Sequence, residues 1–261
     1  MKLKYALAAA AVTLAGTAQA AAPVCSAQST GRTAVLVELY TSEGCDSCPA
    51  ADRWLSSLFS QGYGPGRIVP LALHVDYWDY LGWKDPYAKR DFVARQYKLM
   101  QLRRATFVFT PQVLVQGRDF QRWGTGEFAD AVARINARPA RANIALAIRS
   151  FTPGAVNVEF AAELLETAAQ RHSAVYLAAY ENKLASDVAA GENRGKRLEH
   201  DFVVREWLGP IGFDRGLKLA DRRSLPLLAS ANLKHSGVAA FVQDRSSGEV
   251  LQALMLPACK S

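Results

Sequence analysis

The segment "AVLVELYTSEGCDSCPAADRWL", residues 34–55, joins an apolar run to an amphipathic one through a loop that holds two cysteines. Residues 34–40 are short, apolar and rich in β-favouring side chains, which is typical of a strand covered on both faces. Residues 49–59 place their apolar side chains on one helical face, and Pro49 suits the first turn because its missing N–H costs nothing there. Cys45 and Cys48 therefore lie between a predicted strand and a predicted helix.

The elements that follow predict an α/β order. The run "IVPLALHVD" (68–76) is a second strand, and strand–helix–strand with a short crossover forms a right-handed βαβ unit. We then expect a helix over about 86–103, two short strands at "TFVFT" (106–110) and "QVLVQG" (112–117), and a helix over 126–137. This order is that of a thioredoxin-like domain, which we place at residues 21–140.

Beyond residue 140 the pattern changes from helical to alternating. Apolar and polar residues alternate in "NIALAIRSF", "AVNVEFAAEL" and "SAVYLAAYENKL", and again in "SGVAAFVQD" and "EVLQALMLP" around an "RSSG" turn. Runs of period two joined by short turns predict antiparallel strands. We therefore expect a mainly antiparallel β, sandwich-like domain over residues 141–261.

The first twenty residues have the pattern of a secretory signal peptide. Lys2 and Lys4 precede an apolar run that ends in Ala18-Gln19-Ala20, a small-x-small cleavage pattern. The run is shorter than the about 20 apolar residues that cross a bilayer. We expect residues 1–20 to be removed, leaving a bacterial protein that is periplasmic or secreted and has no stable membrane insertion.

The remaining 241 residues carry a net charge of +5, because the signal segment contributes two lysines and no acids. These charges are spread along the chain, which favours a solvated surface over a nucleic-acid-binding one. We expect no nucleic-acid partner.

Four cysteines in an oxidising compartment are expected to be paired or reactive. Cys25 and Cys259 lie near the two ends of the mature chain, and chain ends often lie close together. We predict a structural disulfide between them, which closes a long loop and contributes up to about 5 kcal/mol on a chain-entropy model. Cys45 and Cys48 are then expected to pair with each other.

The Cys-x-x-Cys pair predicts thiol–disulfide chemistry with protein thiols or disulfides as partners. A helix N-terminus carries partial positive charge and free N–H groups, which stabilise a thiolate on Cys45. Cys48, one turn on, can resolve a mixed disulfide. Asp46 works against the thiolate, so we expect a weaker oxidant than a pair with histidine between its cysteines.

Further residues are predicted to surround the pair. Thioredoxin-like folds place a cis-proline opposite the cysteines, and Thr110-Pro111 before a predicted strand fits that position. Glu38 interrupts an apolar strand; it is either a buried proton acceptor for the resolving thiol, or a carboxylate that pairs with an arginine or faces water. The loop that contains Asp76, Trp78 and Asp79 either lines a groove beside the cysteines or covers an edge of the core.

A non-catalytic module is the alternative hypothesis. No second Cys-x-x-Cys is present to complete a tetrahedral zinc site, so our main expectation is no metal and no cofactor. His74 could instead join Cys45 and Cys48 in a three-ligand copper(I) site, which suits soft thiolates with an imidazole, or it could be a hydrogen-bonded core histidine. A third hypothesis makes both disulfides structural.

Four blocks of the chain resemble the domain-of-unknown-function family 1223 (DUF1223): "VELYTSEGCDSCPAAD", "HVDYWDYLGWKDPYA", "TPQVLVQG" and "ENKLASDVAAGENRGKRLEHDFVVREW". The resemblance implies a secreted bacterial protein with a thioredoxin-like fold, but no reaction. The cysteine motif of the family corresponds to Cys45 and Cys48, and its Thr-Pro to Thr110 and Pro111. The last block also singles out Glu192, Asn193 and His200, without implying a role for them.

Overall fold

The structure is a computed structural model, and it describes residues 25–258 apart from 153 and 215. The predicted signal peptide, residues 1–20, and Cys259 lie outside the described residues. Within the described part of the chain, no helix is both long enough and apolar enough to cross a membrane.

Apart from the strand expected at 106–110, the N-terminal half has the predicted strands and helices in the predicted order. β2 runs parallel to β3 and antiparallel to β4, so β2 lies between them. Every residue of β2 and β3 is buried, as expected for strands that are covered on both faces. The elements are β2 (Val35–Thr41), α1 (Cys48–Ser57), β3 (Ile68–His74), the 3-10 helix η1 (Asp79–Leu81), α2 (Arg90–Leu102), β4 (Gln112–Val115), β5 (Arg118–Asp119) and α3 (Gly126–Asn136).

The predicted strand at 106–110 is wrong. The alternating side chains of "TFVFT" favour an extended strand, but β2 already pairs with β4, so this segment has no strand beside it. The side chain of Phe107 is 69% exposed, and the carbonyl of Phe109 accepts a hydrogen bond from the side chain of Gln96 instead. The segment is a loop that leads into Thr110-Pro111.

The C-terminal half is built of strands, and its pairing is mainly antiparallel. β1 (Cys25–Gln28), from the start of the described chain, joins this half by pairing with β6. The strands are β6 (Ala142–Thr152), β7 (Ala155–Leu164), β8 (Ser173–Glu181), β9 (Leu184–Asp187), β10 (Arg197–His200), β11 (Val203–Gly212), β12 (Lys218–Pro226), β13 (Ser236–Asp244) and β14 (Val250–Pro257).

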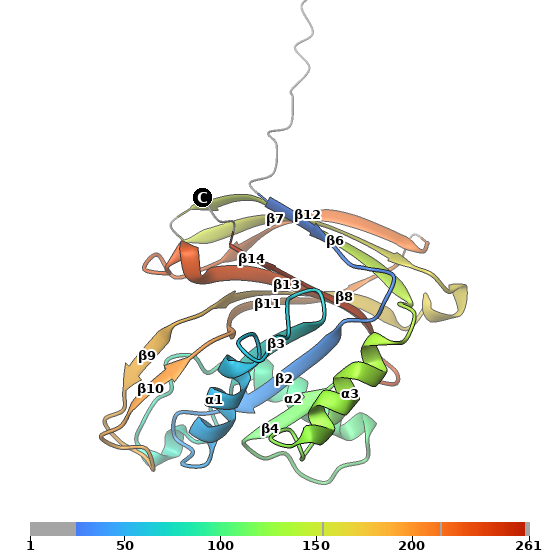
Figure 1. The fold of residues 1–261 in the computed structure, drawn as a ribbon. Coiled ribbons are helices and arrows are strands. Elements are labelled where there is room, and N and C mark those ends of the chain that lie inside the picture. The colour runs from blue at the N-terminus through green and yellow to red at the C-terminus, as the bar shows by residue number, and fades with distance from the viewer. Residues whose placement is uncertain (1–24, 153, 215, 259–261) are drawn as a thin grey trace, which may run out of the picture.

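One large sheet contains strands from both halves of the chain. Its order is β14-β13-β8-β11-β3-β2-β4-β5, and a four-stranded sheet, β1-β6-β7-β12, lies against one part of it (Figure 1). β11 joins β3 in parallel, with Val203 opposite Ala72. The predicted domain boundary near residue 140 falls between α3 and β6, and as a division into domains it stays a prediction.

Two apolar cores fill the space between these layers. One lies among β2, β3, the three helices and one face of β8 and β13, with Tyr40 and Phe241 fully buried in it. The other lies between the two sheets, where Phe160 of β7 packs with the opposite face of β8 and β13. The β9–β10 pair extends beyond the sheets and lies beside α1 (Figure 1).

The termini of the described chain approach each other as predicted. The sulfur of Cys25 lies 4.0 Å from the carbonyl oxygen of Pro257. Because Cys259 lies outside the described residues, its disulfide with Cys25 stays a prediction.

We predict that Gly117→Ala destabilises the protein by at least about 2 kcal/mol, because Gly117 has φ +72° and an added Cβ would lie 2.1 Å from the carbonyl oxygen of Gly248. Gly62→Ala, with φ +91° and open space around it, should cost about 1 kcal/mol. Gly126→Ala, in open space at the start of α3, should be neutral or stabilising. Urea unfolding measures the free energy of unfolding of the three variants. Equal losses would contradict the close contact between Gly117 and Gly248.

Candidate functional site

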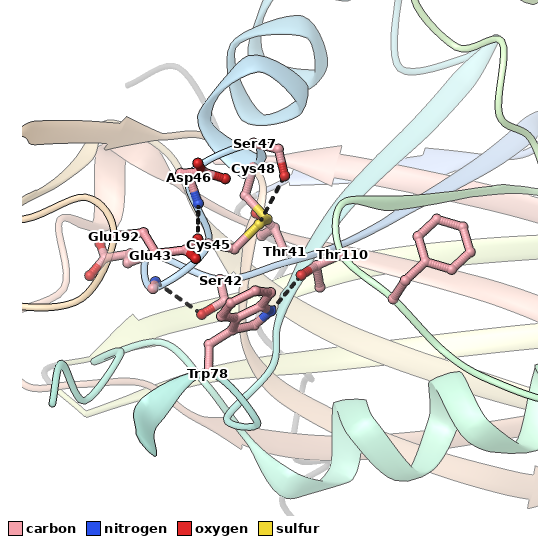
Figure 2. The surroundings of a disulfide bond; sticks show 12 residues. Thr41, Ser42, Glu43, Cys45, Asp46, Ser47, Cys48, Trp78, Thr110 and Glu192 are labelled. Carbon is pink, nitrogen blue, oxygen red and sulfur yellow. Dashed lines mark hydrogen bonds between the residues drawn. A yellow bond between two sulfur atoms is a disulfide. The ribbon is translucent and has the colours of Figure 1, made fainter. Parts of the chain in front are cut away.

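A disulfide joins Cys45 to Cys48 at the N-terminus of α1 (Figure 2). Their Cα atoms are 5.5 Å apart, and Cys48 is the first residue of the helix. The hydroxyl of Ser47 lies 3.4 Å from the sulfur of Cys45. No acidic side chain occupies the first turn of α1, so the partial positive charge of the helix end is not cancelled within the helix.

Trp78 and Thr110 lie beside this disulfide (Figure 2). The indole Nε1 of Trp78 donates a hydrogen bond of 2.6 Å to the hydroxyl of Thr110, and the Thr110–Pro111 peptide bond is cis, as predicted. Trp78 also packs on Gly44, where an added Cβ would lie 2.9 Å from the Cβ of Trp78. The loops at 78 and 110 therefore form one wall next to the cysteines.

The two aspartates of this loop, Asp76 and Asp79, each have a polar contact within the described residues. Asp76 lies 3.7 Å from the guanidinium Nε of Arg90. Asp79 accepts a hydrogen bond of 3.2 Å from the backbone N–H of Asp85. Of the three predicted loop residues, Trp78 has its side chain beside the disulfide (Figure 2), and the place of Asp76 and Asp79 in a groove stays a prediction.

The turn between β9 and β10 covers the cysteine loop. Glu192 accepts a hydrogen bond from the backbone N–H of Asp46, and the amide of Asn193 donates to the carbonyls of Glu43 and Cys45, at 2.8 Å each. Cys45 is 1% exposed and Cys48 0%. Glu192 and Asn193, which only the family resemblance singled out, thus belong to the cover of the disulfide.

Glu38 is an ion-pair partner, which corrects its predicted role in proton transfer. Its carboxylate binds Arg95 of α2 through both oxygens, at 2.5 and 3.1 Å, and the hydroxyl of Tyr40 donates to it at 3.3 Å. Thr41 of the same strand bonds to Asp52 of α1, so Glu38 faces the opposite side of the sheet from α1. Of the two predicted roles, the structure shows pairing with an arginine.

Burial and charge act in opposite directions on Arg95. Burial alone lowers the pKa of its guanidinium, but the attraction of Glu38 outweighs this effect and leaves that pKa raised. The guanidinium also lies over the rings of Tyr176, Trp207 and Phe241, at 4.8 to 5.1 Å from their centroids. The pair is therefore a charged link between the two halves of the large sheet.

A second group of ionisable side chains is buried on the α1 side of the sheet. The Nδ1 of His74 lies 2.8 Å from Asp85, and the Nε2 of His200 lies 3.0 Å from Glu43. Asp52 of α1 accepts a hydrogen bond from Thr41 and lies 3.8 Å from the Nδ1 of His200. All five of the charged or imidazole side chains in this group are buried.

Charge and burial shift the pKa values in this buried group. Burial raises the pKa of Asp52, and the nearby His200 offsets part of that rise. Burial would lower the pKa of His74, but Asp85 outweighs it, so that pKa is raised. For Asp85 the attraction of His74 outweighs burial and the pKa is lowered. Asp85 is therefore an ionised acceptor for His74.

His74 is thus a buried, hydrogen-bonded histidine, and the structure places it with Asp52 and His200. The cysteines of the alternative copper site are joined in a disulfide, so they offer no thiolate in this state. Asp52, Glu43 and Asp85 were not predicted as site residues. A signal for Asp52 was available, because it follows Cys48 by four residues on the predicted helix and so shares its face.

Exposed aromatic side chains continue the wall next to the disulfide. Tyr80 is 77% exposed and stacks on Trp78, with ring centroids 6.4 Å apart. Phe107 is also exposed and contacts Phe109, just before Thr110, at a centroid distance of 6.0 Å. Each of these exposed rings therefore lies against a second aromatic ring, Tyr80 against Trp78 and Phe107 against Phe109.

Comparisons with known proteins give a family and a fold. The model of the family described as "Protein of unknown function (DUF1223)" matches residues 36–243. The X-ray crystal structure of protein AGR_C_4864 from Agrobacterium tumefaciens has a TM-score of 0.62 at 26% identity, over 89% of this chain and 98% of that chain. HBP35 of Porphyromonas gingivalis has a TM-score of 0.64 at 14% identity, over 89% of this chain and 79% of that chain. At this identity the similarity concerns the fold alone. No curated protein matches the chain.

We predict that Glu38→Gln lowers the free energy of unfolding by about 3 to 5 kcal/mol, because it leaves the buried Arg95 without a counter-charge. Glu163→Gln, which breaks an exposed pair with Lys218, is the matched control and should cost at most about 1 kcal/mol. Urea unfolding monitored by fluorescence measures both. Equal, small losses in both variants would contradict this account, because they would mean that the buried Arg95 does not need Glu38 as a counter-charge.

We also predict that Asn193→Ala lowers the free energy of unfolding by about 2 kcal/mol, because two buried carbonyls lose their donor. The same variant should speed reduction of the Cys45–Cys48 disulfide by dithiothreitol under native conditions. Asn232→Ala, which removes an exposed turn contact to Lys234, is the control. An unchanged reduction rate in Asn193→Ala would mean that this turn does not limit access to the disulfide.

Proposed function

The chain belongs to the DUF1223 family, and we propose that it is a periplasmic thiol–disulfide exchange protein with a thioredoxin-like N-terminal half. The observation that carries this proposal is the Cys45–Cys48 disulfide at the N-terminus of α1. When the pair is reduced, the N–H groups and partial positive charge of the helix end favour a thiolate over a thiol.

The exchange transfers two electrons in two thiol steps. A thiolate on a partner protein attacks the sulfur of Cys45, a mixed disulfide forms, and Cys48 leaves as a thiolate. A second thiolate of the partner then attacks its own sulfur in the mixed disulfide and releases Cys45. The partner ends with a disulfide and the Cys45–Cys48 pair ends reduced; the same steps in reverse reduce a partner disulfide, with Cys45 attacking and Cys48 resolving.

The surroundings of the disulfide support a protein as the partner. Trp78 and the Thr110-Pro111 segment form the wall beside the cysteines, and the exposed rings of Tyr80 and Phe107 extend it outward. Aromatic side chains provide large apolar contacts at protein interfaces. We infer that Thr110 and Pro111 belong to the groove that receives the partner.

Exchange requires that the cover over the cysteines moves. Cys45 is almost fully buried, and its carbonyl is held by Asn193 from the β9–β10 turn. An attacking thiolate has to reach the sulfur in line with the disulfide bond. We therefore propose that a partner protein, by docking on the aromatic wall, displaces the turn at Gly191 to Asn193 before reaction.

A second candidate function is a non-catalytic module that binds copper(I) or a partner protein. One observation favours it: the Nε2 of the buried His74 has no hydrogen-bond partner in the structure. Copper(I) held by Cys45, Cys48 and His74 would require a reduced pair. Metal content after purification under reducing conditions distinguishes the two, since a stoichiometric metal lost in Cys48→Ser favours the module.

We predict that Cys48→Ser accumulates mixed disulfides with periplasmic proteins, because the resolving thiol is missing. Cys45→Ser should form none through this site and should lose exchange activity. Trapping followed by non-reducing electrophoresis and mass spectrometry measures both, and the double variant is the background control. Exchange activity retained in Cys45→Ser would overturn the mechanism.

A further inference from the structure

Two buried imidazole nitrogens beneath the cysteine loop have no hydrogen-bond partner. They are the Nε2 of His74 and the Nδ1 of His200, which are 0% and 2% exposed as whole side chains. Their rings meet edge to face, with centroids 4.9 Å apart. Buried polar nitrogens are nearly always satisfied, so a pair left unsatisfied at one place needs a physical reason.

The opposite nitrogens of both rings are held by carboxylates. Asp85 accepts from the Nδ1 of His74, and Glu43 accepts from the Nε2 of His200. An ionised carboxylate only accepts, so each neutral ring carries its proton on the bonded nitrogen and presents a lone pair at the free one. Glu43 is fixed in turn by Trp83 Nε1 at 2.7 Å, and Asp85 by the backbone N–H of Glu43 at 2.9 Å.

Asp52 completes the group of possible ligands. It offers a carboxylate oxygen, and the three ligand atoms of Asp52, His74 and His200 all lie within 4.8 Å of one another. Metal–ligand bonds of about 2.0 to 2.2 Å at a tetrahedral angle place ligand atoms about 3.3 to 3.6 Å apart, so side-chain movements of roughly 1 Å would bring all three onto one ion.

The charge of this buried group also calls for a cation. Asp52, Glu43 and Asp85 are buried acidic side chains around the two imidazoles, and they would carry three negative charges if all three were ionised. Among the described residues, neither lysine nor arginine forms an ion pair with any of the three, whose only ion-pair partners are the two histidines. A bound cation would compensate these acids in their ionised forms, which burial otherwise disfavours.

We propose that Asp52, His74 and His200 form a binding site for a divalent transition-metal cation of the Zn²⁺ class. Two imidazoles and one carboxylate suit such an ion, and the Asp85 and Glu43 contacts are the outer-shell hydrogen bonds that orient histidine ligands. Three protein ligands leave a further coordination position open. This site uses neither cysteine sulfur and does not depend on the exchange chemistry proposed above.

A small cavity between α1 and β10 reaches two of the three proposed ligands. A cavity of about 160 Å³ there is bounded by Asp52 and His200, with Arg53, Arg197 and Glu199 around it. Asp52, which borders this cavity, lies on α1 one helical turn after Cys48. One ligand of the metal would therefore come from the same helix that begins with Cys48.

Equilibrium dialysis of the oxidised mature protein against Zn²⁺, after stripping with a chelator, tests the proposal. With the disulfide intact no thiolate is available, and we expect one Zn²⁺ per chain. Asp52→Asn and His200→Gln should weaken binding at least about tenfold, whereas His172→Gln, at an exposed histidine, should leave it unchanged. Glu43→Gln, which alters only the outer shell, should weaken binding by about 10- to 100-fold.

Two further readouts keep the test decisive if a variant folds poorly. Zn²⁺ should raise the unfolding temperature of the wild-type protein, because a ligand that binds only the folded state stabilises it. The Co²⁺-loaded wild-type protein should show d–d absorption without a thiolate charge-transfer band, in oxidised and reduced protein alike. The proposal is overturned if stripped wild-type protein binds no Zn²⁺, if Asp52→Asn and His200→Gln bind it as the wild type does, or if reduced protein shows the thiolate band.

Discussion

A short parallel ladder between β11 and β3 holds the two halves of the chain in register. Val203 lies opposite Ala72, and the backbone N–H of Ala72 donates to the carbonyl of Phe202 at 2.8 Å. Because His200 lies just before this ladder and His74 at the end of β3, the pairing brings the two imidazoles together. It also directs the β9–β10 turn over the cysteine loop. The pairing of β11 with β3 therefore accounts both for the turn that covers the disulfide and for the buried histidine group.

The two faces of β2 carry different buried charges with different consequences. On the α2 face, Glu38 and Arg95 neutralise each other, and the guanidinium is further packed among aromatic rings. On the α1 face, three acidic side chains meet two imidazoles, and no lysine or arginine forms an ion pair with them in the described part of the chain. A neutral buried pair is a structural link. Two buried imidazole nitrogens without hydrogen-bond partners beside a carboxylate are instead the pattern of a binding site, and this carboxylate, Asp52, lies one helical turn from Cys48.

The sequence predicted most elements because their signals are local. The apolar runs of β2 and β3, the helix after Pro49 and the alternating strands of the second half all follow from short-range patterns, and so does the cysteine pair. The strand expected at 106–110 is absent because a strand needs an unpaired neighbouring strand to bond with. The strand propensity of a segment does not show whether such a neighbour exists. The role of Glu38 depended on Arg95, and the histidine group on residues more than 100 positions apart, so neither could be derived from spacing alone.

The reduction potential of the Cys45–Cys48 pair tests the proposed exchange most directly. The oxidised mature protein would be equilibrated with glutathione buffers, its free thiols alkylated, and each cysteine assigned by mass spectrometry. The account predicts a potential between about −120 and −270 mV, the range of disulfide oxidoreductases. A potential below about −300 mV, typical of structural disulfides in secreted proteins, would contradict it.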